Sequence, residues 1–285
     1  MLLRFMNGLM RRAPPPDEGA LVLEAEASAA KGNVAHAIAC CERVLALDPV
    51  NVAAHRLLAR LTLPGDYYRD VLKRIHQHLK PRTYLEIGVS KGDTIALTCL
   101  DTLAVGIDPD PKLSGPLPPN VRVIEATSDA FFAGGNVAAN FNGLPVELAL
   151  IDGMHHFEFA LRDFINVERC CTRASTVLIH DCYPLDQISA RRERVSQFWS
   201  GDIWKLVLCL KKCRPDLQIN TIGCAPTGLA VVKNLDSAST VLSSRLDEIC
   251  AEFIDLPYST VARDKATLLN LYPNDWERVR SLLAA

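Results

Sequence analysis

The stretch TYLEIGVSKGDT, residues 83–94, decides the fold of this chain. Within it, an apolar run with aromatic and branched side chains gives way to a turn with glycines at positions 88 and 92. Such runs form buried strands, and the glycines let the turn approach another backbone or a ligand closely. We therefore predict a strand, then this turn, then a helix from about Asp93 whose N-terminal amides are available to a ligand.

Helix-length spacers separate most of the further apolar runs along the chain. These runs cover residues 102–108, 121–126, 146–152, 175–181, 217–223 and 228–234. Strands spaced in this way form a mostly parallel sheet with right-handed crossovers. The last two runs are only four residues apart, so they must pair antiparallel as a hairpin. The sequence predicts a Rossmann-like α/β fold with a seven-stranded, mostly parallel sheet and a terminal antiparallel hairpin.

The second predicted strand ends at Asp108, twenty positions after Gly88. An acid at about this spacing receives ribose hydroxyls in dinucleotide-binding folds, whose ligands bind beyond the carboxyl ends of the strands. The turn and the acid together indicate a ligand that contains adenosine. The glycine spacing is GxxxG rather than GxGxxG, which disfavours a nicotinamide or flavin dinucleotide. An NAD-dependent oxidoreductase is therefore the weaker alternative.

Four motifs in order resemble a known enzyme family. LEIGVSKGDT, VGIDPD, IDGMHHFE and the His-Asp pair at 180–181 together resemble the class I S-adenosylmethionine-dependent methyltransferases, in particular the group with IDGxHxYxxxxxD after the fourth strand. The resemblance covers roughly residues 67–234 and implies a methyltransferase domain at 65–235 with S-adenosylmethionine as cofactor. It implies these cofactor-binding residues: Glu86, Gly88, Ser90 and Gly92 at the methionine and sulfonium end, Asp108 at the ribose, and Ser128 and Asp129 at the adenine. Ser128 and Asp129 could equally cap the helix that follows them.

Polar side chains follow two neighbouring strands at the same rim of the predicted sheet. Asp152 follows the fourth strand, His180 and Asp181 end the fifth, and His155 occupies the histidine position of the resembled motif. Methyl transfer needs mainly positioning of the reactants and deprotonation of the acceptor. By one route His155 or His180 acts as general base, which contributes about 10²–10⁴-fold in rate. By the other route Asp152 and Asp181 hold a divalent cation such as Mg²⁺ that lowers the pKa of the acceptor.

The histidine beside Asp181 is an unusual neighbour for a hard cation, which prefers oxygen ligands, so the metal ligands stay undecided. We predict S-adenosylmethionine-dependent O-methylation of a small molecule that bears a hydroxyl group, with a glycosyl or aromatic acceptor as candidates. The alternative from another class is a non-catalytic docking protein with a methyltransferase-like fold. The intact acids at the strand ends and His155 argue against it.

A long insertion, residues 182–216, separates the fifth and sixth predicted strands. It contains a basic and aromatic set: Arg191, Arg192, Arg194, Phe198, Trp199 and Trp204. The set could form a lid with an aromatic wall and a cationic rim for a planar, glycosyl or anionic acceptor. It could equally be an amphipathic helix that covers the sheet.

Helical patterns flank the sheet domain on both sides. We predict a tail at 1–16, a helical segment at 17–64 and C-terminal helices at 236–285. Within the helical segment, GNVAHAI and VLALDPVN resemble the second half of one tetratricopeptide repeat. One repeat cannot bury a solenoid core, so we interpret the segment as a packed appendage or as a cap that binds a protein partner or a second copy.

Charge and cysteine usage exclude several classes of protein. The 31 basic and 33 acidic side chains give a net charge of −2, which disfavours nucleic acid as the main partner. No apolar run is long enough for a membrane span. Ten cysteines in a chain of this length, with no cleavable signal apparent, indicate reduced thiols and a cytoplasmic protein. The four histidines on predicted helices, His36, His55, His76 and His78, are expected to be exposed.

Overall fold

A computed structural model describes residues 17–284, so the predicted tail at 1–16 lies outside the described residues. The chain divides after Leu58 into two compact units. The division falls inside helix α3 (Val52–Thr62), somewhat before the boundary predicted near Pro64. None of the helices between residues 17 and 284 combines the length and apolarity that a membrane span requires.

The first unit contains a helical hairpin formed by α1 (Glu18–Ala30) and α2 (Val34–Leu47). Side-chain caps fix where its helices begin, because Asn33 Oδ1 accepts a hydrogen bond from the amide of His36 and Asn51 Oδ1 accepts one from the amide of Ala54. The buried face of the hairpin combines Leu21 with smaller residues: Ala25, Ala37, Cys40, Cys41 and Val44. The helices of this segment are as predicted, while its resemblance to a tetratricopeptide repeat stays a prediction.

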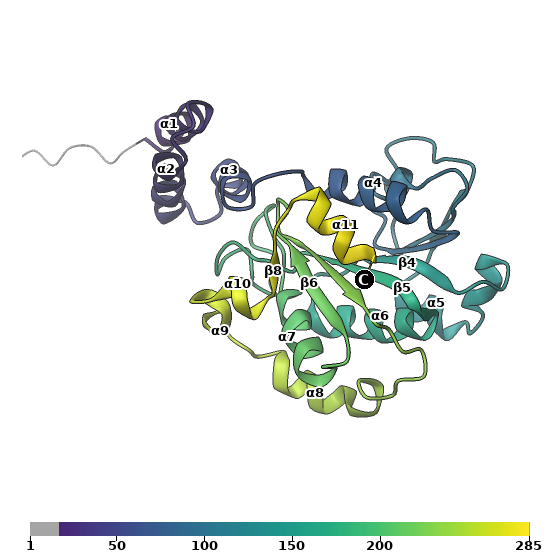
Figure 1. Ribbon diagram of the computed structural model, residues 1–285. Coiled ribbons are helices and arrows are strands. Elements are labelled where there is room, and N and C mark those ends of the chain that lie inside the picture. Colours follow the sequence, from purple (N-terminus) through teal and green to yellow (C-terminus); the bar gives the residue numbers. More distant parts are fainter. Residues whose placement is uncertain (1–16, 285) are drawn as a thin grey trace, which may run out of the picture. The chain divides into compact units, whose positions relative to one another are not determined.

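The second unit is built on one sheet of eight strands (Figure 1). The strands are β1 (Thr83–Ile87), β2 (Leu103–Asp108), β3 (Val121–Glu125), β4 (Val146–Ile151), β5 (Cys171–His180), β6 (Gln218–Ile222), β7 (Leu229–Lys233) and β8 (Leu271–Tyr272). Their order is β3-β2-β1-β4-β5-β7-β6-β8, and β7 runs antiparallel to both of its neighbours. All seven predicted strands are confirmed, as is the antiparallel hairpin of β6 and β7.

The predicted count of seven strands is wrong by one. Strand β8 pairs parallel with β6 inside the C-terminal region that was predicted to be helical. It has only two residues, which is too short for an alternating pattern to reveal. Its pairing is set by tertiary contacts, as the amides of Thr221 and Gly223 donate to the carbonyls of Asn270 and Tyr272.

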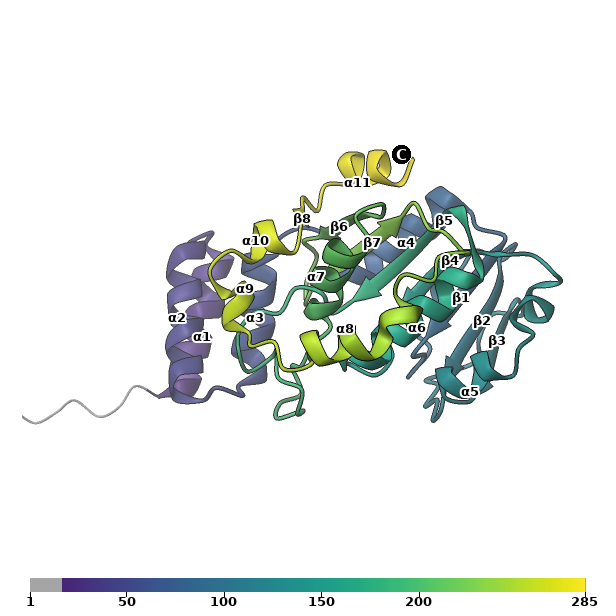
Figure 2. The ribbon, with the colours of Figure 1, turned by 90° about the horizontal axis from the view of Figure 1, so that it is seen from below.

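Helices cover both faces of the sheet (Figure 2). On one face lie α4 (Tyr68–Leu79) and α11 (Trp276–Ala284), and on the other lie α6 (Phe157–Arg169), α7 (Trp204–Cys213) and α8 (Leu246–Phe253). The remaining helices are short: α5 (Ser128–Ala133), α9 (Ser259–Ala262), α10 (Lys265–Leu268), and the 3-10 turns η1 (Ile95–Leu97), η2 (Val137–Phe141) and η3 (Ser243–Arg245).

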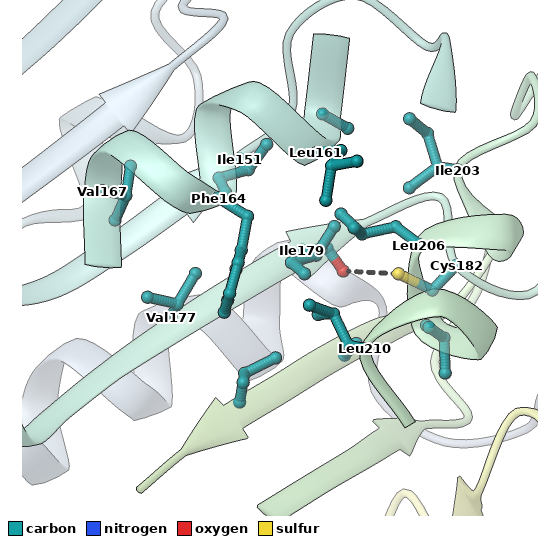
Figure 3. Close-up of a cluster of buried hydrophobic side chains, with 14 of the residues drawn as sticks. Ile151, Leu161, Phe164, Val167, Val177, Ile179, Cys182, Ile203, Leu206 and Leu210 are labelled. Carbon is teal, nitrogen blue, oxygen red and sulfur yellow. Dashed lines mark hydrogen bonds between the residues drawn. The ribbon is translucent and has the colours of Figure 1, made fainter. Parts of the chain in front are cut away.

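Alternation along each strand divides the core between the two faces. Figure 3 shows the layer beneath α6 and α7, where Leu161 and Phe164 of α6 contact the sheet near Ile151 and Ile179. Phe164 has no exposed surface. Burying such a side chain contributes about 1.5–3 kcal/mol relative to leaving it exposed. Leu161 and Phe164 therefore anchor α6 on the core, which fixes the residues just before this helix.

Two expectations about helices are wrong. The helix predicted from about Asp93 is only the 3-10 turn η1, because β-branched Thr94, Ile95 and Thr98 disfavour a helix and Thr98 adopts an extended conformation. His55 and His76 are buried, not exposed. The ring of His76 packs edge-on against Tyr84. Burial lowers the pKa of His76 to about 4.

Candidate active site

Gly88 joins the turn after β1 to the end of β4. Its φ is +88°, and a Cβ atom there would lie 2.1 Å from the backbone oxygen of Asp152. No side chain tolerates this contact, so glycine is required. Ser90 and Gly92 in the same turn also have positive φ, of +48° and +82°. The turn predicted to bind the cofactor therefore rests directly on the predicted catalytic rim.

Asp108 ends β2 and holds the same turn with its carboxylate. Its Oδ2 accepts hydrogen bonds from the amides of Val89 (2.9 Å) and Ser90 (2.7 Å), and its Oδ1 accepts one from the amide of Asp110 (2.8 Å). A carboxylate offers about four acceptor positions, so about one is left for a ligand hydroxyl. Asp108 is only half-buried. Its place is compatible with the ribose contact that the resemblance implies.

Glu86 lies beneath the turn and has no exposed surface. Its two carboxyl oxygens accept hydrogen bonds from the hydroxyl groups of Tyr84 (2.6 Å) and Thr94 (2.7 Å). Burial raises the pKa of Glu86 to about 8, although these two hydroxyl donors oppose the rise. The neutral form therefore dominates at pH 7. Glu86 therefore supports the turn from inside the core, through its contact with Thr94.

The two residues predicted at the adenine, Ser128 and Asp129, are both bonded to α6. Thr127, not Ser128, caps α5 by accepting a hydrogen bond from the amide of Ala130. Asp129 pairs with the guanidinium of Arg162 through contacts of 2.9 and 3.1 Å. Ser128 is hydrogen-bonded to Asp163, whose pKa is raised to about 6 by burial. A ligand at this position would compete with these internal partners.

The four residues predicted to be catalytic form one cluster at the carboxyl ends of β4 and β5. His155 Nε2 lies 3.2 Å from Asp181 Oδ2 and 3.7 Å from Asp152 Oδ1. His180 Nδ1 lies 3.2 Å from Asp152 Oδ1 and 3.3 Å from Asp181 Oδ2. Asp181 has a φ of +60° and also accepts a hydrogen bond from the hydroxyl group of Thr227. Two imidazoles and two carboxylates thus share one small site.

Each histidine of this cluster stacks on an aromatic ring. His155 stacks on Trp199, with 4.9 Å between ring centroids and 17° between the planes. His180 stacks on Tyr68, at 4.1 Å and 25°. The indole N–H of Trp199 donates to the carbonyl of Arg191 (2.6 Å). Sequence reasoning missed Tyr68, the first residue of α4; it stands out only as one of two adjacent tyrosines, which does not connect it to this cluster.

The carboxylates control the protonation of the histidines. Burial alone would lower the pKa of both His155 and His180. The charges of Asp181 and Asp152 outweigh this effect and raise both pKa values above the ordinary value of 6.5, and the pKa of His180 rises much further than that of His155. Conversely, burial would raise the pKa of Asp152, but His180 and His155 hold it well below its ordinary range. At neutral pH we therefore assign the proton to His180, which bridges the two carboxylates.

One ring nitrogen of each histidine has no hydrogen-bond partner within residues 17–284. These buried atoms are His155 Nδ1 and His180 Nε2. A buried polar atom without a partner costs about 1–3 kcal/mol. Structures keep such groups mainly where they serve a function, so the cluster has the properties of a working site rather than of a structural ion pair.

The cluster has donor atoms for a divalent cation. One ligand atom each from Asp152, His155 and Asp181 lie within 4.8 Å of one another. Carboxylates combined with an imidazole suit Mn²⁺, Fe²⁺ or Zn²⁺ better than Mg²⁺, which prefers oxygen ligands. A cation can bind His155 Nε2 only when that nitrogen carries no proton.

Two residues of the insertion after β5, Gly201 and Asp202, contact the backbone of His155. The amide of Asp202 donates to the carbonyl of His155 (3.2 Å), and a Cβ atom on Gly201 would lie 2.0 Å from the same carbonyl oxygen. Asp202 is fully buried, and its Oδ1 accepts a hydrogen bond from the amide of Phe157 (2.7 Å) at the start of α6. Its Oδ2 accepts from Arg192 (2.7 Å) and Lys205 (3.0 Å). The segment Ser200–Asp202 therefore fixes the position of His155.

The interpretation of the insertion as a helix that covers the sheet is correct for part of it, while the lid over an acceptor stays a prediction. Residues 204–213 form α7, which covers the sheet. The preceding part lies at the rim and carries Trp199, over whose ring the Arg194 guanidinium lies at 5.7 Å. Arg192 is no free rim cation, because it pairs with Glu158 (2.8 Å) as well as with Asp202.

Residues 85–182 match the family model described as a methyltransferase domain. The matched segment runs from β1 past the end of β5 and contains all four residues of the rim cluster. The match confirms the predicted enzyme class, an S-adenosylmethionine-dependent methyltransferase, and with it the predicted cofactor. No curated protein sequence matches the chain.

Two solved structures are similar to this chain at low sequence identity. The O-methyltransferase from Bacillus cereus in complex with SAH is 11% identical over 79% of this chain and 92% of its own, with a TM-score of 0.44. The cofactor-bound Rv0187 from MTB is 15% identical over 79% of this chain and 99% of its own, with a TM-score of 0.47. Both TM-scores lie below 0.5.

Proposed function

We propose that this S-adenosylmethionine-dependent methyltransferase methylates a hydroxyl oxygen of a small-molecule acceptor at the rim cluster of Asp152, His155, His180 and Asp181. The observation that carries the proposal is the convergence of two imidazoles and two carboxylates at the point where the turn after β1 meets the end of β4. Acceptor deprotonation is the step that such a cluster can perform.

The residues around the turn after β1 fit the cofactor in part. We assign the contact with the ribose to Asp108, which keeps an acceptor position, and the contact with the methionine end to the backbone of Gly88, Ser90 and Gly92. Glu86 would act on this site only by supporting the turn, since its side chain is fully buried. When bound, the cofactor supplies an electrophilic methyl group on a sulfonium centre.

His155 is the residue we assign as general base. Its contact with Asp152 is the longest in the cluster, 3.7 Å, so an acceptor hydroxyl can replace it at Nε2 at the lowest cost. For this role the neutral ring carries its proton on Nδ1, so Nε2 takes the hydroxyl proton, and Asp181, 3.2 Å from Nε2, stabilises the imidazolium that forms. The protonated His180 balances the charge of Asp152 throughout. If a divalent cation binds, Asp152, His155 and Asp181 would hold it, and its charge would lower the pKa of the acceptor.

The aromatic rings at the rim support a planar or glycosyl acceptor. Trp199 is half-buried and stacks on His155, so apolar ring surface borders the assigned base, whereas Tyr68 is buried against His180. Ring faces of this kind pack against aromatic rings and against the apolar faces of sugars. The Arg194 guanidinium over Trp199 adds a positive charge, which an anionic substituent on the acceptor could use.

The test is an acceptor screen with labelled S-adenosylmethionine, run with and without a chelator. Phenolic, catecholic and glycosyl acceptors should yield products in which mass spectrometry and NMR place the new methyl group on oxygen. Loss of activity with the chelator and recovery with Mn²⁺ or Zn²⁺ would assign the cation route, whereas unchanged activity would assign the base route. Methylation confined to nitrogen, or tight cofactor binding with no transfer to any acceptor, would contradict the proposal.

A further inference from the structure

The helical hairpin α1–α2 carries a second group of metal-binding side chains, which the proposed reaction does not use. His36 Nε2 lies 2.7 Å from Glu24 Oε1 and 3.6 Å from Cys40 Sγ. One donor atom from each of the three residues lies within 4.8 Å of the other two. His36 and Cys40 are one turn apart on α2, and Glu24 reaches them from α1.

We propose that Glu24, His36 and Cys40 bind Zn²⁺ or a similar thiophilic divalent ion, with solvent as the fourth ligand. In a tetrahedral zinc site the histidine nitrogen lies about 2.0–2.1 Å and the cysteine sulfur about 2.3 Å from the metal, which places these two atoms about 3.6 Å apart. The His36 Nε2–Cys40 Sγ distance has this value. Two of the three ligands are therefore already spaced for the ion.

The third ligand needs only a small movement. The tetrahedral edge between a zinc-bound nitrogen and a carboxylate oxygen is about 3.4 Å, so Glu24 must withdraw by about 0.7 Å from its present hydrogen bond. The Glu24 and His36 side chains are 48% and 45% exposed, which leaves both free to adjust. Cys40 is buried, with 1% of its surface exposed, and packing holds its sulfur in place. One fixed and two adjustable ligands can close on an ion without rearranging the hairpin.

The chemistry of the three donors selects a particular class of ion. A thiolate with an imidazole and a carboxylate prefers Zn²⁺ or Co²⁺ over Mg²⁺ or Ca²⁺. Binding must displace the thiol proton, and burial together with Glu24 raises the pKa of Cys40, whereas nearby Arg43 lowers it. The affinity should therefore increase with pH. The rim cluster has no cysteine among its three candidate ligands, so a metal–sulfur signal distinguishes the two sites.

The experiment is a Co²⁺ titration of the tag-free, full-length protein, followed by Zn²⁺. Tetrahedral Co²⁺ bound to a thiolate gives a sulfur-to-metal charge-transfer band in the near ultraviolet and visible bands of high intensity. We expect one equivalent to produce these bands and Zn²⁺ to abolish them. Cys40→Ser should remove the charge-transfer band, and His36→Ala should weaken binding by at least about tenfold, since even an outer-shell change can cost about 10–100-fold.

Three controls keep the result interpretable. Cys41→Ser alters the adjacent buried thiol and should retain the band. Asp181→Asn removes a ligand of the rim cluster and should also retain it. Circular dichroism should show that Cys40→Ser and His36→Ala keep the helices. Absence of the band in the wild type, or its persistence in Cys40→Ser, would overturn the proposal and leave an ordinary Glu–His hydrogen bond beside a buried cysteine.

Discussion

The ends of β1 and β2 and the ends of β4 and β5 lie at the same edge of the sheet, but their acids have different partners. Asp108 bonds to the amides of the turn, and Glu86 bonds to buried hydroxyl groups. Asp152 and Asp181 instead face histidines whose other ring nitrogens have no partner within residues 17–284. Asp108 and Glu86 therefore hold the turn after β1 in place, while Asp152 and Asp181 control the protonation of His155 and His180.

Gly88→Ala should give the largest effect, because Gly88 is where the two regions touch. Its Cβ would lie 2.1 Å from the Asp152 carbonyl oxygen, and its φ of +88° strains any other residue. We expect a loss of about 3–5 kcal/mol in the free energy of unfolding, from strain and overpacking together, with loss of cofactor binding. Urea unfolding and calorimetric titration measure the two quantities.

Gly143→Ala is the matched control for this prediction. Gly143 has a φ of +80°, but a Cβ atom added there would meet no other atom within 4 Å, so the variant should lose only the strain, about 1–2 kcal/mol. Equal losses in the two variants would show that the turn does not depend on its contact with the end of β4.

Gly201→Ala should act on the rim alone. The new Cβ would collide with the His155 carbonyl oxygen, at 2.0 Å, and displace the imidazole. A shift of about 1 Å costs about 10²-fold in rate, so we expect that loss in kcat with S-adenosylmethionine affinity unchanged. Gly135→Ala, with a φ of +79° and open space around it, should keep full rate. An unchanged kcat in Gly201→Ala would show that the Ser200–Asp202 segment does not position His155.

The rate of methyl transfer should increase with pH. The neighbouring carboxylates raise the pKa of His155 above 6.5, and only the neutral imidazole can accept a proton. Below that pKa the single-turnover rate should rise about tenfold per pH unit and then level off. A rate that is flat between pH 6 and 8, or falls, would contradict His155 as the base.

Glu86→Gln should have the smallest effect on binding and a distinct effect on stability. The folded-state pKa of about 8 lies above the unfolded value of 4.5, so this group stabilises the fold below pH 4.5 and loses that contribution as pH rises through 8. The wild type should therefore lose up to about 1.4 kcal/mol per pH unit over this range from Glu86, and the variant should not. Cofactor affinity should change by less than about threefold; a larger loss would indicate direct contact between Glu86 and the cofactor.

The sequence was sufficient for those features that depend on local pattern. Buried runs predicted seven strands, and the convergence of parallel strand ends predicted that Asp152, Asp181 and the two histidines meet. Tyr68 and Asp202 could not be assigned in this way, because each reaches the cluster from an element distant in sequence. The helix predicted after β1 was too long, because the β-branched residues that follow the glycine turn disfavour a helix. A cytoplasmic location and a partner for the N-terminal helices stay predictions.

The most direct measurement compares His155→Ala with His156→Ala in single-turnover methyl transfer. His155 lies between two carboxylates, whereas the ring of its neighbour His156 donates a hydrogen bond to the carbonyl of Arg192 (3.0 Å). We predict that His155→Ala lowers the rate by about 10²–10⁴-fold with cofactor affinity retained, and that His156→Ala stays within a few-fold of the wild type. Equal rates in the two variants would contradict the assignment of acceptor deprotonation to the rim cluster.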